Sequence, residues 1–195
     1  MTIQPNRFER RKQRTRRLLL DTARALLLER GYDAITVQEI TDRADLGRGT
    51  FYVHFKDKEE IIWTLVQENV DELDAKIEEI APGRPLEQRI YGIWRVTFAH
   101  FQANRDLVLV VFGKQGHIGL ANRLHDYFVE LMINDLRVVP AETLLPLPID
   151  YTANYLVGAQ MRIAVWWLEH APQYTPDQIA AMFYQMTIHH LPTEG

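Results

Sequence analysis

The stretch ADLGRGTFYVHFKDKEE, residues 44–60, decides the fold, because it joins a glycine-containing turn to a helical segment with two different faces. Phe51 and Phe55 are four residues apart, so they share one face of a helix and can anchor it to a core. Tyr52 and His54 reach other sectors of the same helix. The segment therefore offers a second, polar face to a partner.

The residues around this stretch predict a pair of short helices. Thr36 and Glu39 have the spacing of a capping box, in which each side chain accepts a backbone N–H, so a helix begins there. Residues 45–47 carry a turn signal, and a second short helix is predicted over residues 48–55. Two short helices with a three-residue turn between them form a helix-turn-helix.

The rest of the chain also predicts helices. Leu19, Ala23 and Leu26 follow a helical stripe that ends at Gly31, which predicts a first helix over residues 14–30. Later helices are predicted from Asp57 to the APGRP stop and along the 90–101 stripe. A short apolar helix and a glycine-containing connection are predicted within NRDLVLVVFGKQG, residues 104–116. Further helices are predicted over residues 120–137 and 151–170 and from Thr175-Pro176 onward, with a proline-rich loop at residues 140–150. No long alternating segment argues for a sheet, so the predicted class is all-α.

Amino-acid composition indicates the cellular compartment in which the protein is expected. With 195 residues and 47% hydrophobic content, the chain can bury a substantial core, and it contains no cysteine. No segment approaches the ~20 apolar residues that a membrane helix requires, and no secretory signal pattern is present. We expect a cytoplasmic protein with no membrane partner.

The net charge of −4 conceals an uneven distribution. Residues 1–58 hold 13 Lys/Arg against 8 Asp/Glu, whereas residues 59–195 hold 9 against 18. Seven of the basic residues lie between Arg7 and Arg17. A basic end on an acidic body is expected when only that end meets a polyanion.

The polar face of residues 48–54 has the chemistry of a nucleic-acid contact. Its arginine, hydroxyl, phenol and imidazole groups can all donate hydrogen bonds to phosphate oxygens or base edges. Arg48, at the start of the helix, can pair with a guanine through two hydrogen bonds.

The segment TVQEITDRADLGRGTFYVHFKDKEEII resembles the DNA-binding domain of the TetR (tetracycline repressor) family of bacterial transcription regulators, over about residues 12–66. The resemblance implies that Thr36 and Lys58 contact phosphates and that the other residues face the major groove or its flanking phosphates. The implied DNA-binding residues are Thr36, Arg48, Gly49, Thr50, Tyr52, His54 and Lys58.

Two positions depart from the family pattern. Asp45 stands where the family usually has glycine in the turn, and Asp tolerates the left-handed conformation better than most residues. Gly47 stands where a serine or threonine usually caps the second helix, so it offers no side-chain oxygen.

The resemblance also implies a division of labour. Residues 1–57 are expected to form a basic arm and a three-helix, helix-turn-helix DNA-binding domain. A continuous helix joins it to residues 58–195, expected to be a helical effector-binding and dimerisation domain. The expected function is a homodimeric repressor, paired through its two C-terminal helices, that binds a palindromic double-stranded operator and responds to a small molecule.

Aromatic residues are abundant in the second half and suggest a cavity for an apolar effector. Polar contacts are expected from nearby histidines and arginines, among them His100. The candidate effector-binding residues are Trp94, Phe98, Phe101, His117, Tyr127, Arg162 and Trp166.

Two alternatives remain open on the sequence. The helix-turn-helix can belong to a protein-interaction module, or the aromatic cavity can serve an all-α enzyme. Serine is absent as well as cysteine, and no metal-ligand spacing or phosphate-binding loop is present. We therefore expect no catalytic site, no metal and no cofactor.

Overall fold

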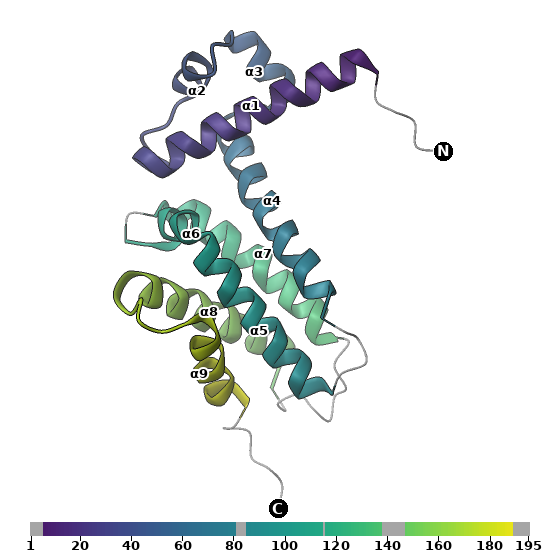
Figure 1. Ribbon diagram of the computed structural model, residues 1–195, viewed down its shortest axis with the longest axis vertical. Helices are drawn as coiled ribbons and strands as arrows, with labels where there is room; N and C mark the ends of the chain where they lie inside the picture. The colour runs from purple at the N-terminus through teal and green to yellow at the C-terminus, as the bar shows by residue number, and fades with distance from the viewer. Residues whose placement is uncertain (1–5, 81–84, 115, 138–146, 189–195) are drawn as a thin grey trace, which may run out of the picture. The chain divides into compact units, whose positions relative to one another are not determined.

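In the computed structural model, residues 6–80, 85–114, 116–137 and 147–188 are described. These residues form nine helices and no strand, so the predicted all-α class is confirmed (Figure 1). Most of the predicted proline-rich loop lies outside them. The helices are α1 Arg7–Arg30, α2 Val37–Arg43, α3 Arg48–His54, α4 Lys58–Glu78, α5 Leu86–Ala103, α6 Arg105–Phe112, α7 Ile118–Arg137, α8 Ile149–His170 and α9 Pro176–Ile188.

The chain divides into two compact units, Met1–Glu72 and Leu73–Gly195. We call them unit 1 and unit 2. The sequence suggests a boundary between residues 57 and 58, just before α4, whereas the division by packing falls inside α4. This helix therefore contributes residues to both units.

Unit 1 is built around apolar side chains from α1 to α4. Leu19, Ile40, Phe51 and Ile61, one from each helix, are completely buried. Burying a side chain of this size contributes about 1.5–3 kcal/mol. The seven-residue helices α2 and α3, which are too short to be stable alone, are thereby held in one core with α1 and α4.

The start of α1 differs from the prediction. The helix begins at Arg7, not at residue 14, because Asn6 caps it: the Asn6 Oδ1 atom accepts the backbone N–H of Glu9 at 2.9 Å. The apolar stripe marks only where the helix meets the core, and Leu19 is its first buried residue. The predicted end is confirmed, with Gly31 at a φ of 76°.

Two other predicted helix starts are confirmed. The Asp57 Oδ1 atom accepts the backbone N–H of Glu60 at 2.8 Å, just before α4. Thr175 precedes α9, and its Oγ1 atom accepts the backbone N–H of Gln178 at 3.3 Å. Side-chain oxygens thus satisfy the otherwise unpaired N–H groups at both starts.

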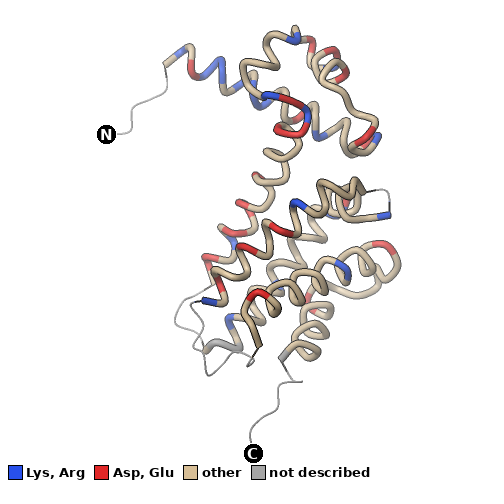
Figure 2. Tube along the Cα trace, turned by 180° about the vertical axis from the view of Figure 1, so that it is seen from behind, with Lys and Arg blue, Asp and Glu red and all other residues tan. Residues whose placement is uncertain are grey.

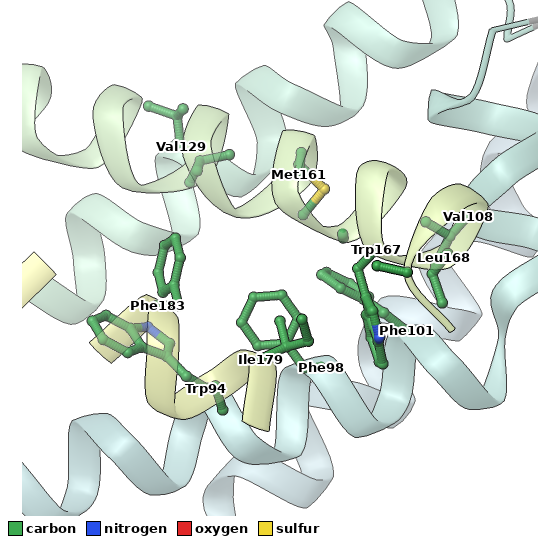
Figure 3. Close-up of a cluster of buried hydrophobic side chains, with 14 of the residues drawn as sticks. Trp94, Phe98, Phe101, Val108, Val129, Met161, Trp167, Leu168, Ile179 and Phe183 are labelled. Atoms are coloured by element: carbon green, nitrogen blue, oxygen red, sulfur yellow. The ribbon is translucent and has the colours of Figure 1, made fainter. Parts of the chain in front are cut away.

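Unit 2 packs its helices around an aromatic cluster, shown in Figure 3. The ring centroids of Trp94 and Phe183 lie 4.8 Å apart, and those of Phe98 and Trp167 lie 6.1 Å apart, both edge to face. This geometry is the one that aromatic quadrupoles favour. The indole N–H of Trp167 donates to the carbonyl of Tyr174 at 2.9 Å, so its one polar atom is satisfied.

Candidate nucleic-acid interface

The helix-turn-helix is held by local hydrogen bonds. Thr36 and Glu39 form the predicted capping box: the backbone N–H of Thr36 donates to the Glu39 carboxylate at 2.9 Å, and that of Glu39 donates to Thr36 Oγ1 at 3.2 Å. In the turn, Asp45 adopts a φ of 53°, and the N–H of Leu46 donates to the carbonyl of Thr41 at 2.9 Å. The left-handed turn therefore forms without glycine at that position.

One face of α3 belongs to the core. Phe51 and the capping residue Phe55 are buried, and their ring centroids lie 5.8 Å apart. Tyr52 packs the edge of its ring against Phe51 at 5.5 Å but leaves 58% of its surface exposed. Phe51 and Phe55 thus set the rotation of the helix about its own axis, and that rotation decides which side chains face outward.

The outward face of α3 presents most of the predicted DNA-binding residues. Arg48, Gly49 and Tyr52 are exposed, while Thr50 and His54 are half-buried at its edges. Thr36 is exposed at the start of α2. A methyl group added to Gly49 would meet no atom within 4 Å, so packing inside the chain does not require glycine there.

Gly47 precedes α3 without contributing a side-chain hydrogen bond to it. The backbone N–H of Thr50 instead donates to the Gly47 carbonyl at 2.9 Å. The start of α3 is therefore less firmly capped than the start of α2.

Lys58, a predicted phosphate contact, also binds Tyr32 within the chain. Its Nζ atom donates to the carbonyl of Tyr32 at 3.0 Å and lies 4.3 Å from the centroid of the Tyr32 ring. The side chain thereby fastens the first turn of α4 to the segment that follows α1. A lysine placed in this way combines a hydrogen bond with a cation–π contact.

Sequence reasoning left Val53 out of the candidate site. Its side chain is 68% exposed on α3, among the polar groups of the outward face. An apolar side chain in such a place can contact the methyl group of a thymine in the major groove. The sequence position of Val53 could have identified it, because Val53 lies between the candidates Tyr52 and His54 and is not on the helix face shared by Phe51 and Phe55.

The end of α3 meets positive charge from α1. Burial lowers the pKa of His54 below its usual value, and the nearby charges of Lys12 and Arg16 lower it further. The Arg16 guanidinium also lies over the Phe55 ring, 4.8 Å from its centroid. Two cations of α1 therefore adjoin this end of the outward face.

The candidate effector residues do not form one group. Trp94, Phe98 and Phe101 lie together in the buried aromatic cluster. The His117 Nδ1 atom accepts the backbone N–H of Leu120 at 3.2 Å, so this imidazole caps the start of α7. The remaining three lie apart from the cluster: Tyr127 is half-buried beside Phe128, and Arg162 and Trp166 are exposed on α8.

A buried imidazole lies on the same helix as three members of the aromatic cluster. His100 is 3% exposed on α5, one residue before Phe101, and its Nδ1 atom lies 3.2 Å from the Nζ atom of Lys76. The side-chain amide of Asn104 lies within 3.5 Å of the same ring. This is a polar, hydrogen-bonded position within an otherwise apolar part of unit 2.

Within the described ranges, no group of three or more metal-ligating side chains is placed to hold a metal ion. Over the same ranges, no helix is both long and apolar enough to span a bilayer.

Comparison with known proteins supports this interpretation of the interface. Residues 19–63 match the model of the family described as bacterial regulatory proteins, tetR family. Residues 88–189, more than half of the chain, match a model described as a transcriptional regulator C-terminal region.

Two curated relatives each match less than half of the chain. The HTH-type transcriptional regulator AcrR of Shigella flexneri is 38% identical over 77 residues, which is 38% of this chain and 36% of that protein. The HTH-type transcriptional repressor KstR2 of Mycobacterium tuberculosis is 34% identical over 94 residues, 47% of this chain and 46% of that protein. The matched region thus spans between about a third and a half of these relatives.

A solved structure extends the likeness to nearly the whole chain. The transcriptional regulator FadR from Bacillus subtilis, crystallised with stearoyl-CoA, superimposes with a TM-score of 0.66 over 88% of this chain and 96% of that one. The two sequences are 16% identical, so the likeness concerns the fold. With both family models and the helix-turn-helix geometry in agreement, the chain belongs to the TetR family of bacterial regulatory proteins.

Proposed function

We propose that this chain is a cytoplasmic transcriptional regulator, a repressor, that binds a palindromic operator as a homodimer and loses operator affinity when unit 2 binds a small apolar molecule. The observation that carries the proposal is the outward face of α3. Phe51 and Phe55 hold the helix in place, and Arg48, Tyr52 and His54 remain accessible on its other side. The curated relatives AcrR and KstR2 are named as transcriptional regulators, which supports the same role.

The presence of two compact units supports a division of labour. Residues 1–57 carry the DNA-binding role, with contacts from Thr36, Arg48, Gly49, Thr50, Tyr52 and His54, and Lys58 adds a contact from the first turn of α4. Residues 58–195 carry effector binding and dimerisation. A helix-turn-helix that bound protein instead of DNA would show little salt dependence, because it would release few condensed counterions.

Dimerisation is supported by exposed apolar side chains on the last two helices. Tyr151, Tyr155 and Trp166 are exposed on α8, and Met182 and Met186 are exposed on α9. Clustered large apolar side chains on a surface usually mark an interface. A two-fold dimer also matches the symmetry of a palindromic site, and it doubles the number of bases that one short helix can read.

The effector proposal is supported by the aromatic interior of unit 2. Trp94, Phe98 and Phe101 form an apolar interior of the kind that an apolar ligand prefers, and the buried His100 is a polar group on the same helix, one residue before Phe101. FadR, which shares the fold, is described with stearoyl-CoA bound. Stearoyl-CoA is therefore the first probe that we would test on this chain.

The DNA-binding role predicts different effects for Arg48 and Lys58. Arg48→Ala removes a base contact, so we expect it to reduce the preference for operator over scrambled duplex by about 1–3 kcal/mol. Lys58→Ala removes a phosphate contact, so both duplexes should weaken alike and the salt slope should fall by about 0.9. Fluorescence anisotropy with DNA flanking the gene, at two salt concentrations, measures both quantities.

Lys114→Ala, which removes an exposed lysine of unit 2, is the control and should leave binding unchanged. Because Lys58 also bonds Tyr32, its variant needs a check by circular dichroism that unit 1 is folded. Equal effects of the Arg48 and Lys58 substitutions on both duplexes would contradict the assigned roles.

His54 predicts a pH dependence with opposite signs for folding and for binding. Its pKa is lowered in the folded chain, so its contribution to stability is present above the unfolded value of 6.5 and is lost as pH falls through the folded value. Phosphates nearby favour the protonated ring, so DNA binding takes up a proton. Operator affinity should therefore rise as pH falls through the pKa of His54 in the DNA complex, and His54→Gln should abolish that rise.

Anisotropy titrations between pH 5.5 and 7.5, with unfolding curves at the same pH values, separate the two effects. A wild-type pH profile identical to that of His54→Gln would remove His54 from the interface.

The dimer predicts a specific effect of charge on α8. Tyr155→Glu places a carboxylate among exposed apolar side chains, so sedimentation velocity should show a monomer with weakened operator binding. Ile118→Glu is the matched control, because Ile118 is a 73% exposed apolar residue at the first position of α7 and belongs to neither α8 nor α9. If Tyr155→Glu still sediments as a dimer of wild-type stability, the interface lies elsewhere.

Effector action predicts reciprocal coupling. Stearoyl-CoA should bind the free protein about 5–150-fold more tightly than the operator complex, and it should weaken operator binding by the same factor. Calorimetric titration of both forms measures the ratio. Equal affinities for the two forms would exclude this molecule as the regulatory ligand.

A further inference from the structure

The first turns of α1 have no role in the core of unit 1. Leu19 is the first buried residue of the helix, so the twelve residues from Arg7 to Leu18 precede any fully buried side chain. At 1.5 Å per residue they amount to ~18 Å of helix. All side chains from Arg7 to Arg14 are exposed. We call Arg7–Arg14 the α1 extension.

Repulsion between like charges destabilises the α1 extension when only water surrounds it. It carries four arginines and a lysine against one acid, Glu9, and Figure 2 shows the blue segments along this part of α1. Several of the cations are three or four residues apart, as Arg7 and Arg11 are, and like charges at these spacings repel one another. An anionic partner would remove that repulsion.

The cations of α1 closest to the core, Arg16 and Arg17, already contact other side chains of unit 1. Arg17 pairs with Asp21 at 2.9 Å and with Glu68 at 3.2 Å, and Arg16 lies over the Phe55 ring. Most cations of the α1 extension have no such contact among the described residues. Four cations of the α1 extension form no ion pair with any residue that the structure describes: Arg7, Arg11, Lys12 and Arg14.

The α1 extension adjoins the outward face of α3. Lys12 is close enough to His54 for its charge to lower the pKa of that imidazole, and Arg16 acts on it from one turn further along α1. The Arg16–Phe55 contact fixes the same juxtaposition by geometry. The cations Lys12 and Arg16 of α1 therefore lie beside the end of α3.

We propose that the α1 extension is a second DNA surface, which neutralises phosphates outside the base pairs read by α3, with Lys12 the innermost contact and Arg7, Arg11 and Arg14 further out. This inference rests on the proposed DNA-binding function. Arginine and lysine contacts to phosphate carry no sequence information, so the surface adds affinity and salt dependence without changing which bases are preferred.

The test compares three variants of the full chain with the wild type. One replaces Arg7, Arg11, Lys12 and Arg14 with alanine, one is Lys12→Ala, and the control is Arg24→Ala. Arg24 is an exposed arginine of the same helix, beyond Leu19, with no ion pair among the described residues. Alanine favours helix, so circular dichroism should show undiminished helicity in every variant.

Each variant is titrated with two duplexes, one trimmed to the selectively bound base pairs and one extended by about a helical turn at each end. We expect Lys12→Ala to make the plot of log binding constant against log salt concentration less steep by about 0.9. Between 50 and 200 mM salt, the factor by which affinity falls should then be about threefold smaller than for the wild type. The fourfold variant should lose more, chiefly on the extended duplex. Its ratio of operator to scrambled affinity should stay that of the wild type.

The outcomes separate this inference from the function on which it rests. A wild type that binds selectively, together with a fourfold variant that keeps the wild-type slope on both duplexes, overturns the second DNA surface and leaves the regulator proposal standing. An equal loss in Arg24→Ala also overturns it, because charge anywhere on α1 would then suffice. A wild type without selective, salt-dependent binding overturns both.

Discussion

The burial of Phe51 and Phe55 is the interaction on which the candidate interface depends. The helix α3 is only seven residues long, too short to be stable in isolation, and Gly47 gives it no side-chain cap. The core of unit 1 therefore supplies both its stability and its orientation. By occupying one side of the helix, the two phenylalanines place Arg48, Tyr52 and Val53 on the other.

The charged groups of unit 1 fall into two sets with different roles. Some cations hold the helices together, as the bidentate pairing of Arg43 with Glu29 and the contact of Lys58 with Tyr32 illustrate. Others at the start of α1 form no ion pair with any described residue, namely Arg7, Arg11, Lys12 and Arg14. A net charge counted from the sequence cannot separate these groups, because the pairing depends on which helices meet.

Unit 2 separates its aromatic side chains in a comparable way. Trp94, Phe98 and Trp167 are packed inside, whereas Trp166, the immediate neighbour of Trp167, is 45% exposed. Adjacent residues on a helix point about 100° apart, so one tryptophan serves the interior while the next faces outward. We relate the interior set to effector binding and the outward set, with Tyr151 and Tyr155, to pairing of two copies.

The sequence by itself determined what depends on near neighbours: the all-α class, the capping box at Thr36, the turn through Asp45 and the starts at Asp57 and Thr175. These rest on contacts within four residues, and local patterns record them. The start of α1 at Arg7 and the capping of α7 by His117 are also local contacts, but they lie outside the apolar stripes from which the helices were predicted. Tertiary structure alone decided that Lys58 holds Tyr32 and that Trp166 is exposed. A contact between residues far apart and the rotation of a helix against its neighbours leave no periodic trace, because both are set by how the helices pack.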